Sequence, residues 1–354
     1  MKKFFISFIL IVSLLFNVFA DNKQAHKELR EIFENYSMYP EMVEKGFDLD
    51  KLDKIDDWKE MRDYLQPFFQ DENGYPLDNH TNICFLSLDR TETYSTLDTE
   101  SSMFIDFSDE YSSKDELLKK GYKEDEIFYY PYFNGEWRDG YRVGKKFMGN
   151  RNYKYRLSNR GPYLISSEKA LLVGLSDFFN NQYYSEISDS KKKYLILDLS
   201  YNCGGSVDYY FELVDDAIKK MKPKEIFILC DNCTASMGEF SSSWIEKATN
   251  IKTTIIGYPT WGGWKHGKFR HTISFDTFIM YCDVEDNKSP WRALWDRYDI
   301  PYPTEGIGVT PDIYTNNVKE SLEVVKHLIK DNSLYLPEDY VQEIDFRIQY
   351  KKWK

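Results

Sequence analysis

A serine in the second half of the chain stands where nucleophilic chemistry is feasible. Ser236 lies between an apolar run, residues 225–229, and a helical pattern over 236–249. A serine at a strand-to-helix turn is exposed, and the positive end of the helix dipole favours the negative charge that develops during attack. Ser236 is therefore a candidate nucleophile for acyl transfer. The alternative role is structural, because serine is also a common N-cap of helices.

Two further loops have a composition that suits the binding of a developing oxyanion. Gly204 and Gly205 follow the apolar run 193–199, and the glycine-rich segment 257–263 follows another apolar run. Adjacent glycines allow backbone N–H groups to approach a ligand closely and to point at it. Together with Ser236, these loops predict a site that is lined by backbone amides.

The elements around these loops alternate regularly after residue 160. Apolar runs of four to six residues between helices of 12 to 14 residues are typical of buried parallel strands, so we expect an α/β layered structure. Such sheets carry their sites on the loops at the carboxyl ends of the strands. The expected elements are helices over 169–181, 208–221, 236–249 and 317–330, buried strands over 193–199, 225–229 and 253–256, and one or two edge strands over 269–280.

The preceding part of the chain is predicted to be helical and then mixed α+β. Amphipathic spacing predicts helices over 25–36 and 58–69, and short apolar runs predict strands over 83–88 and 102–107. Ser113 begins an S-x-x-E capping box, which predicts the start of a further helix. The predicted parts of the chain are a signal peptide over 1–20, an N-terminal region over 21–160, a core over 161–335 and a tail over 336–354.

The first residues have the composition of a cleaved secretory signal. Lys2 and Lys3 precede a nearly unbroken apolar run over 4–19, and Val18 and Ala20 occupy the −3 and −1 positions of a small-residue cleavage site. The run is short for a membrane span, and no stop-transfer pattern follows it. We expect an exported protein, periplasmic or secreted, without a membrane segment after cleavage. An uncleaved anchor is the alternative.

Composition excludes several functional classes. The chain of 354 residues has 46 Lys and Arg against 58 Asp and Glu, a net charge of −12, which argues against nucleic-acid binding. Its aromatic content of 17% is too high for a disordered chain. No H-E-x-x-H, G-x-G-x-x-G or P-loop pattern occurs, so we expect no metal or other cofactor. Cys230 and Cys233 are interpreted as a structural pair or two unrelated thiols rather than as a redox centre.

Four motifs in order resemble those of one protease family. Residues 198–205 are D-L-S-Y-N-C-G-G, 234–239 are T-A-S-M-G-E, 257–263 are G-Y-P-T-W-G-G, and 306–312 are G-I-G-V-T-P-D. They are similar to the motifs of the C-terminal processing (tail-specific) proteases, and most similar to the branch of the tricorn core and the interphotoreceptor-retinoid-binding-protein-like domains. The resemblance covers about residues 160–325 and implies a ClpP/crotonase-like layered core with parallel strands and flanking helices.

The resemblance also implies roles for individual residues. Ser236 corresponds to the nucleophile of the family, which attacks a peptide carbonyl to give an acyl-enzyme. The N–H group of Met237, with that of Gly204 or Gly205, would form the oxyanion hole. Glu239 opens the helix after the serine, where we expect it to support the helix start electrostatically rather than to act as a catalyst. The family's arginine in the first motif is replaced by Ser200.

The general base differs from that of the Ser-Lys branch, because Gly263 stands at the position of the family's lysine. Lys265 and Lys268 follow it, and either would reach the serine only after a rearrangement of the loop. A glycine at this position matches the branch that uses a serine, a histidine and a glutamate. His266 is the local candidate for the base, and Glu305 corresponds to the relay glutamate of the tricorn-like branch.

We therefore expect an exported serine endopeptidase that cleaves peptides or unfolded proteins. The sequence has no G-L-G-F carboxylate-binding loop, so we predict no PDZ domain. Two alternatives remain open. A catalytically inactive member of the same fold would bind a peptide or another ligand, and a surface interaction protein would use the tyrosine-rich residues 80–160.

Overall fold

The chain forms two compact units, one from residues 1–100 with 265–295 and one from 101–264 with 296–354, called unit 1 and unit 2 below. The boundary placed near residue 160 falls within unit 2, and the predicted signal peptide lies outside the described residues. No helix in the described part of the chain has both the length and the apolar character to cross a membrane. The computed structural model describes residues 22–69, 82–88, 93–95, 101–151, 161–264, 268–285, 298–300, 306–337 and 350–351.

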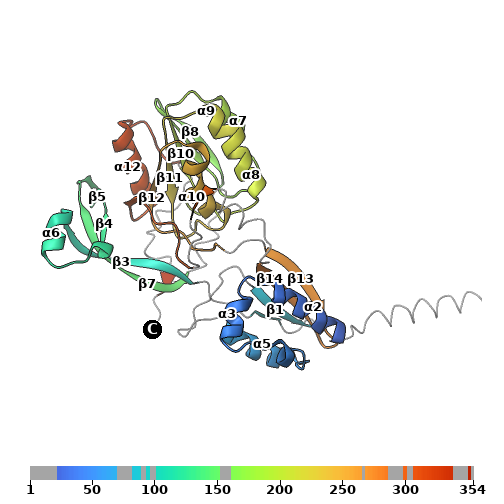
Figure 1. Cartoon of the computed structure of the whole chain (residues 1–354). Helices are drawn as coiled ribbons and strands as arrows, with labels where there is room; N and C mark the ends of the chain where they lie inside the picture. Colours follow the sequence, from blue (N-terminus) through green and yellow to red (C-terminus); the bar gives the residue numbers. More distant parts are fainter. Residues whose placement is uncertain are drawn as a thin grey trace, which may run out of the picture. The chain divides into compact units, whose positions relative to one another are not determined.

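Unit 2 is built on a six-stranded sheet with the order β15-β12-β11-β10-β9-β8 (Figure 1). Every neighbouring pair from β9 to β15 is parallel, and β8 is antiparallel to β9. These pairings confirm the predicted α/β class with buried parallel strands. The strands are β8 Tyr163–Ser166, β9 Ala170–Gly174, β10 Tyr194–Asp198, β11 Glu225–Cys230, β12 Thr253–Gly257 and β15 Ile313–Tyr314.

Helices flank this sheet. Leu322 and Val325 of α12 join a buried cluster with Ile196, Phe227 and Ile256 of the strands, so α12 covers one face. Figure 1 shows α7, α8 and α9 on the other side of the sheet from α12. The helices of this part are α7 Tyr184–Asp189, α8 Val207–Phe211, the π-helical η4 Glu212–Ile218, α9 Lys219–Met221, α10 Met237–Thr249 and α12 Val318–Ile329.

The helix predicted over 169–181 is wrong, because β9 occupies its first half. Alanine and leucine favour helices in isolation, and a short apolar run does not distinguish a buried strand from a buried helix. All five residues of β9 are buried, between β10 on one side and β8 on the other. Burial on both faces of a sheet decides the structure here, and that burial depends on residues distant in sequence.

A second group of strands in unit 2 comes from residues 101–151 and the end of the chain. β3 Ser101–Ser112 pairs with β7 Tyr141–Arg151, and β7 also pairs with β4 Ile127–Tyr129 and β16 Tyr350–Lys351. The Ser113 hydroxyl accepts the Glu116 N–H at 3.4 Å, which confirms the predicted start of a helix. The remaining elements are α6 Lys114–Lys119, η2 Glu124–Glu126, β5 Tyr132–Phe133 and β6 Glu136–Trp137.

Unit 1 combines helices with an antiparallel sheet of order β13-β14-β1-β2. Leu29 and Phe33 of α2 pack with Phe85, Ile273 and Phe278 of the strands in one buried cluster. The elements are α2 Asn22–Asn35, α3 Tyr39–Glu44, α4 Leu49–Leu52, α5 Trp58–Leu65, η1 Gln66–Phe68, β1 Asn82–Ser87, β2 Thr93–Ser95, β13 Lys268–Ser274 and β14 Phe278–Glu285.

The strands predicted over 269–280 exist as β13 and β14, but they do not belong to the parallel sheet. β14 lies between β13 and β1, so the pairing joins segments almost 200 residues apart. The side chains of Ile273, Met280 and Cys282 are buried in the core of unit 1. Alternation of polar and apolar residues indicated strands here, but local alternation does not specify the partner strand.

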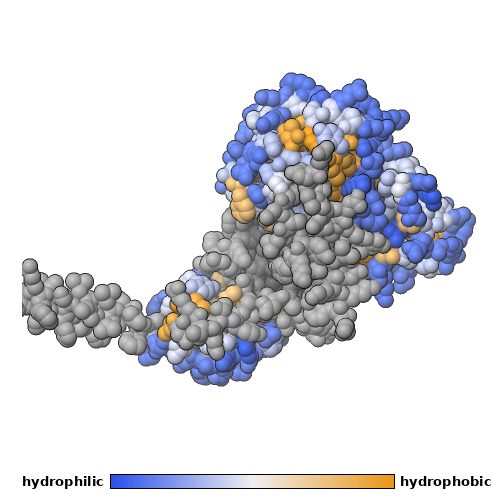
Figure 2. All heavy atoms as spheres, turned by 180° about the vertical axis from the view of Figure 1, so that it is seen from behind, coloured by the Kyte–Doolittle hydropathy of each residue, from blue (hydrophilic) through white to orange (hydrophobic). Residues whose placement is uncertain are grey.

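The described surface is mainly hydrophilic. On the face drawn in Figure 2, apolar colour is confined to separate small patches. The exposed large apolar side chains among the described residues are Val43, Leu88, Leu118, Phe179, Ile307, Leu328 and Tyr335. Single exposed apolar residues of this kind are normal on a protein surface, so these patches alone indicate no binding site.

Candidate active site

Three sequence motifs lie at the carboxyl ends of parallel strands in unit 2, and the fourth contacts the loop after β12. The loop after β10 contains Gly204 and Gly205, the loop after β11 leads to Ser236, and the loop after β12 contains Gly262. The fourth motif, residues 306–312, directly precedes β15. The described motif residues therefore lie close together at this edge of the sheet, and their role as a site stays a prediction.

Ser236 has a backbone conformation that serine rarely adopts. It directly precedes α10, and its φ of 55° and ψ of −127° lie outside the extended region that an N-cap residue usually occupies. A strained backbone conformation of this kind costs about 1–3 kcal/mol, and such residues cluster at functional sites. The side chain is half-buried at a sharp strand-to-helix turn, which is the setting of a nucleophile elbow.

Gly204 lies directly against Ser236. A Cβ atom on Gly204 would be 2.4 Å from Ser236 Cβ, 2.7 Å from Ser236 Oγ and 2.9 Å from the backbone N of Met237. The hydroxyl oxygen and the Met237 N–H therefore border the same small space on the surface of Gly204. Any larger residue at position 204 would fill that space, so the sequence requires glycine there for close approach as well as for its φ of 94°.

The backbone amides around this space are not equivalent. The Gly204 N–H donates to Asn202 Oδ1 at 2.8 Å and is therefore already used within the loop. Within the described part of the chain, the N–H groups of Gly205 and Met237 have no hydrogen-bond acceptor. The first N–H groups of a helix lack partners inside the helix, and Met237 is the first residue of α10. Of the two glycines, Gly205 is the one whose amide remains available.

The loop after β9 fixes Gly205, a contact that the sequence did not indicate. The Phe178 N–H donates to Gly204 O at 2.7 Å, and the Ser206 N–H donates to Phe178 O at 2.8 Å. These two bonds form a short parallel bridge between Phe178 and Gly205. A Cβ on Gly205 would be 2.5 Å from the Phe178 carbonyl carbon, so glycine is needed at this position too.

Glu239 is a fully buried carboxylate that joins two of the loops. Its Oε2 accepts the Ser236 N–H at 3.0 Å and the Gly263 N–H at 3.0 Å, and its Oε1 accepts the Thr260 hydroxyl at 2.7 Å. The Gly262 N–H also donates to Oε1. The bond to Ser236 is the return half of a capping box, in agreement with the predicted support of the helix start. The bonds to the loop after β12 extend that role, because they couple the serine turn to a second loop.

The loop after β12 and the fourth motif fit together through glycine. The Gly306 N–H donates to Gly262 O at 2.8 Å, and the Val309 N–H donates to Thr260 Oγ1 at 2.7 Å. A Cβ on Gly308 would be 2.0 Å from Thr260 O, and one on Gly262 would be 2.5 Å from the Gly306 carbonyl carbon. The spacing of glycines in these motifs therefore follows from direct backbone contact between the two loops.

No protein-family model and no curated protein matches this sequence. Among solved structures, the chain is similar to a lipoprotein from Streptococcus agalactiae, with 14% identity and a TM-score of 0.40 over 88% of this chain and 96% of that one. It is similar to the tricorn protease, with 20% identity and a TM-score of 0.31 over 42% of this chain and 15% of that one. It is also similar to mature CPAF complexed with lactacystin, with 12% identity and a TM-score of 0.39 over 87% and 98%.

A buried aspartate side chain and the backbone carbonyl of a buried asparagine hold the first two loops in place. Asp231 Oδ1 accepts the N–H groups of Tyr201, Cys233 and Thr234 at 2.9 to 3.0 Å. Asn202 O accepts the Ala235 N–H at 2.8 Å, which links the loop after β10 to the residue before Ser236. Because a buried carboxylate is stable only when hydrogen bonded, these contacts fix the geometry of both loops.

The start of β3 supports the site from the N-terminal part of unit 2. The Ser102 hydroxyl donates to Trp261 O at 2.7 Å, and the Met103 N–H donates to Gly306 O at 2.9 Å. The Tyr258 hydroxyl accepts the Ile105 N–H at 2.7 Å. The strand predicted over 102–107 exists as part of β3. Its position against the site loops depends on hydrogen bonds to residues distant in sequence, which a local sequence pattern does not predict.

The predicted base and relay are not among these contacts. His266, Lys265 and Glu305 lie outside the described residues, so their positions remain predictions. Within the described part of the chain, no imidazole or amine is hydrogen bonded to Ser236 Oγ. Lys268 lies on β13 in unit 1. The described candidate site therefore consists of Ser236 as candidate nucleophile, the available amides of Gly205 and Met237, and the residues that support them.

Cys230 closes β11 at the base of the loop that leads to Ser236. Its thiol is free and fully buried, and it donates to Tyr258 O at 3.5 Å. Burial raises the pKa of the Cys230 thiol well above its ordinary value, so the thiolate is strongly disfavoured. A C-x-x-C redox centre requires an accessible thiolate, and Cys230 has the opposite properties. The sequence left two interpretations of this motif, a structural pair and two unrelated thiols. The free thiol of Cys230 favours the second.

Proposed function

We propose that this protein is an exported serine peptidase that cleaves peptides or unfolded proteins. The observation that carries the proposal is the arrangement at Gly204, where Ser236 Oγ and the Met237 N–H border one small space. A nucleophile that lies beside an unused amide, at a strained strand-to-helix turn, suits attack on a carbonyl carbon whose oxygen becomes negative.

In this mechanism Ser236 Oγ attacks the carbonyl carbon of a peptide bond to form a tetrahedral intermediate. The N–H groups of Met237 and Gly205 donate to the oxyanion, and removal of one such donor typically costs about 3–4 kcal/mol of transition-state stabilisation. Collapse of the intermediate releases the amine and leaves an acyl-enzyme. Water then attacks the acyl-enzyme, which releases the acid and restores the serine.

We assign the proton transfers in this proposal to His266, and we assign the orientation of its imidazole ring to Glu305. His266 would accept the proton of Ser236 Oγ during attack and donate it to the leaving amine. It would then take a proton from water during hydrolysis of the acyl-enzyme. The support for this assignment is the sequence: His266 follows the glycine motif at 262–263, and Gly263 replaces a lysine base.

Export is proposed from the N-terminal sequence. Lys2 and Lys3, the apolar run and the small residues before Asp21 suit cleavage by a signal peptidase and release to a periplasm or to the medium. Intact-mass analysis of the chain exported by a secreting cell tests this. A single N-terminus at or close to residue 21 would support it. A chain that retains residues 1–20 would contradict it.

Mass spectrometry of unfolded protein substrates tests the peptidase proposal. The mature chain is compared with Ser236→Ala and His266→Ala, and circular dichroism verifies that all three are folded. We expect new peptides from the wild type, none from Ser236→Ala, and a loss of at least about 10²-fold in His266→Ala, within the usual range for general bases. Cleavage that survives in Ser236→Ala would contradict the proposal.

A binding protein on the same scaffold is the second candidate. It is favoured by one observation, which is that within the described residues no base is hydrogen bonded to Ser236 Oγ. This candidate predicts that peptides raise the thermal midpoint equally in the wild type and in Ser236→Ala, with no product in either. Turnover by the wild type that depends on Ser236 decides against it.

A further inference from the structure

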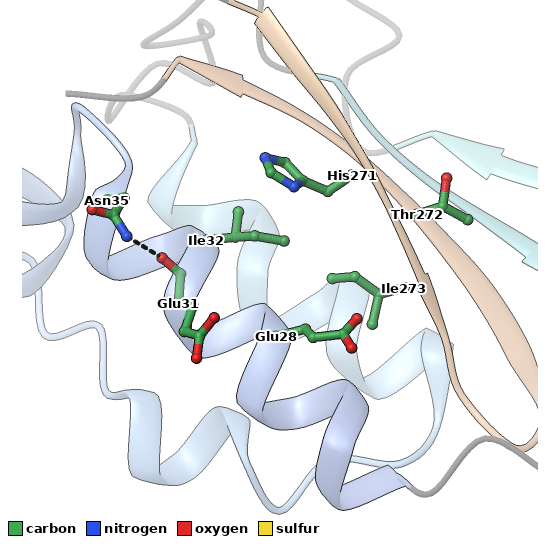
Figure 3. Close-up of a pocket in the computed structure, with 7 residues that line it drawn as sticks. All are labelled: Glu28, Glu31, Ile32, Asn35, His271, Thr272 and Ile273. Atoms are coloured by element: carbon green, nitrogen blue, oxygen red, sulfur yellow. Dashed lines mark hydrogen bonds between the residues drawn. The ribbon is translucent and has the colours of Figure 1, made fainter. Parts of the chain in front are cut away.

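A cavity in unit 1 is lined by residues that belong to none of the four motifs of the proposed peptidase site. Its volume is about 390 Å³, and it lies between α2 and β13 (Figure 3). Cavities of this size accommodate a side chain or a small ligand, and apolar lining with a few polar groups is typical of binding sites. The residues that line it are Glu28, Glu31, Ile32, Asn35, His271, Thr272 and Ile273.

The lining combines an apolar floor with acidic walls. Ile32 and Ile273 are buried in the core of unit 1 and form the floor. Glu28 is a neighbour of both Glu31 and Ile32 on the surface of α2, because residues three and four positions apart lie next to each other on a helix. Figure 3 shows the Glu28 carboxylate extending toward β13, the Glu31 carboxylate over α2, and His271 pointing from β13 toward α2.

The two carboxylates have little internal compensation. Within the described residues, Glu28 forms no ion pair, and its carboxylate accepts only the Gln24 amide at 2.9 Å. Glu31 has one cationic neighbour in the described chain, Lys27, at 4.0 Å, and both side chains are exposed. Arg30 of the same helix pairs instead with Asp50, Asp53 and Glu34. An exposed pair at 4.0 Å contributes little, so the described lining residues leave the two carboxylates largely uncompensated.

The cavity also reaches the backbone edge of β13. His271, Thr272 and Ile273 are consecutive, yet all three line it, although neighbouring side chains on a strand point to opposite faces. Figure 3 shows His271 and Ile273 on the helix side of β13 and Thr272 on the other side. In the described chain, β13 has a strand neighbour on one side only, β14. Its other edge presents N–H and C=O groups that an added strand can pair with.

We propose that this cavity binds the side chain of a lysine or arginine in an extended peptide segment that pairs with the edge of β13. Charge complementarity selects the side chain: Glu28 and Glu31 supply two negative charges above an apolar floor that suits a methylene stem. Among the described residues no cluster of His, Cys, Asp and Glu has the geometry of a metal site, which favours an organic cation. The backbone edge selects a peptide over a free amine.

Fluorescence anisotropy on the mature chain that carries Ser236→Ala tests this proposal without turnover. The probes are two labelled peptides, Thr-Val-Lys-Val-Thr and the same sequence with norleucine, which keeps the apolar stem and lacks the charge. We expect the lysine peptide to bind at least about tenfold more tightly at low salt, with a smaller ratio at high salt because exposed charges are screened. This experiment uses the unaltered cavity. If the two peptides bind it with equal affinity, the proposal is overturned.

A charge-matched pair of variants then assigns the binding to the cavity. Glu28→Gln with Glu31→Gln removes two charges from the lining, and Glu41→Gln with Glu44→Gln removes two charges from exposed positions that do not line it. We expect the first pair to abolish the preference for lysine and the second to keep it. A preference that survives in the first pair, or is lost equally in both, contradicts a site in this cavity.

A competition with Nα-acetyl-lysine methylamide, in which the side-chain amine is free, distinguishes a peptide site from a site for small amines. We expect this compound to compete at least about 100-fold less well than the lysine peptide, because it offers too little backbone to pair with β13. Competition with equal potency would show that the amine alone is bound and would overturn the strand pairing. All of these readouts are equilibrium affinities, so they stand or fall independently of peptidase activity.

Discussion

The Ser236 loops in unit 2 and the cavity between α2 and β13 in unit 1 both contain carboxylates, but their partners differ. Glu239 is fully buried and accepts hydrogen bonds from three backbone amides and one hydroxyl. Glu28 is partly exposed, and in the described chain a single glutamine amide donates to it. The first carboxylate has its acceptor capacity used inside the fold, whereas the second has capacity left for a ligand.

This difference separates positioning from binding. A buried charge is costly unless hydrogen bonds compensate it, so a carboxylate such as Glu239 fixes the groups that donate to it. A partly exposed carboxylate without a cation costs the fold little and attracts positive charge from solution. Substitutions in the two regions should therefore affect different quantities: unfolding and turnover in unit 2, and ligand affinity in unit 1.

Among the substitutions that compare the two regions, the largest effect is expected for Gly204→Ala. The new Cβ would fill the space between Ser236 Oγ and the Met237 N–H, so turnover should fall by roughly 10²–10³-fold, as for the loss of an oxyanion donor. Steady-state kinetics on an unfolded substrate measures this loss. Gly121→Ala is the matched control, because Gly121 also has a φ of 94° but no atom within 4 Å of the new Cβ.

The control variant should lose about 1–2 kcal/mol of stability from backbone strain and keep its activity. Gly204→Ala carries the same backbone strain and also places a Cβ against Ser236 and Met237. The difference in turnover between the two variants therefore tests this contact alone. Equal turnover in the two variants would mean that the space beside Gly204 is not where the carbonyl oxygen is bound.

A smaller effect on turnover is expected for Glu239→Gln. The amide group of glutamine replaces one acceptor by a donor, which leaves buried N–H groups near Ser236 and Gly263 without partners. We expect the free energy of unfolding to fall by about 2–4 kcal/mol and turnover to fall about tenfold. Glu28→Gln, which removes a partly exposed charge on α2, should change the free energy of unfolding by less than about 0.5 kcal/mol. Urea denaturation of both variants measures the contrast, and similar losses would contradict the distinction between the two carboxylates.

The core of unit 2 follows from local sequence, because β10, β11, β12 and α10 have clear apolar patterns and short connections. The convergence of Ser236, Gly204 and Gly262 follows from the same patterns, since parallel strands place their carboxyl ends at one edge. The conformation of Ser236 is a departure that local preferences do not predict, and such departures are expected at functional sites.

Features that depend on distant segments were not accessible from the sequence. β9 resembles a helix until its burial between β8 and β10 is known, and β14 pairs with β1 across most of the chain. The bridge between Phe178 and Gly205 and the hydrogen bond from Ser102 to Trp261 O have no local signature. The cavity of unit 1 likewise exists only because β13 lies beside α2.

Covalent labelling of Ser236 tests the central claim most directly. The mature chain is incubated with a fluorophosphonate, and intact mass and peptide mapping then locate the adduct, with Ser236→Ala as the control. If Ser236 is an activated nucleophile, one equivalent is added, the adduct maps to Ser236, and the alanine variant is not labelled. No adduct on a folded wild-type chain, or equal labelling of Ser236→Ala, would contradict the account of this site as a serine peptidase.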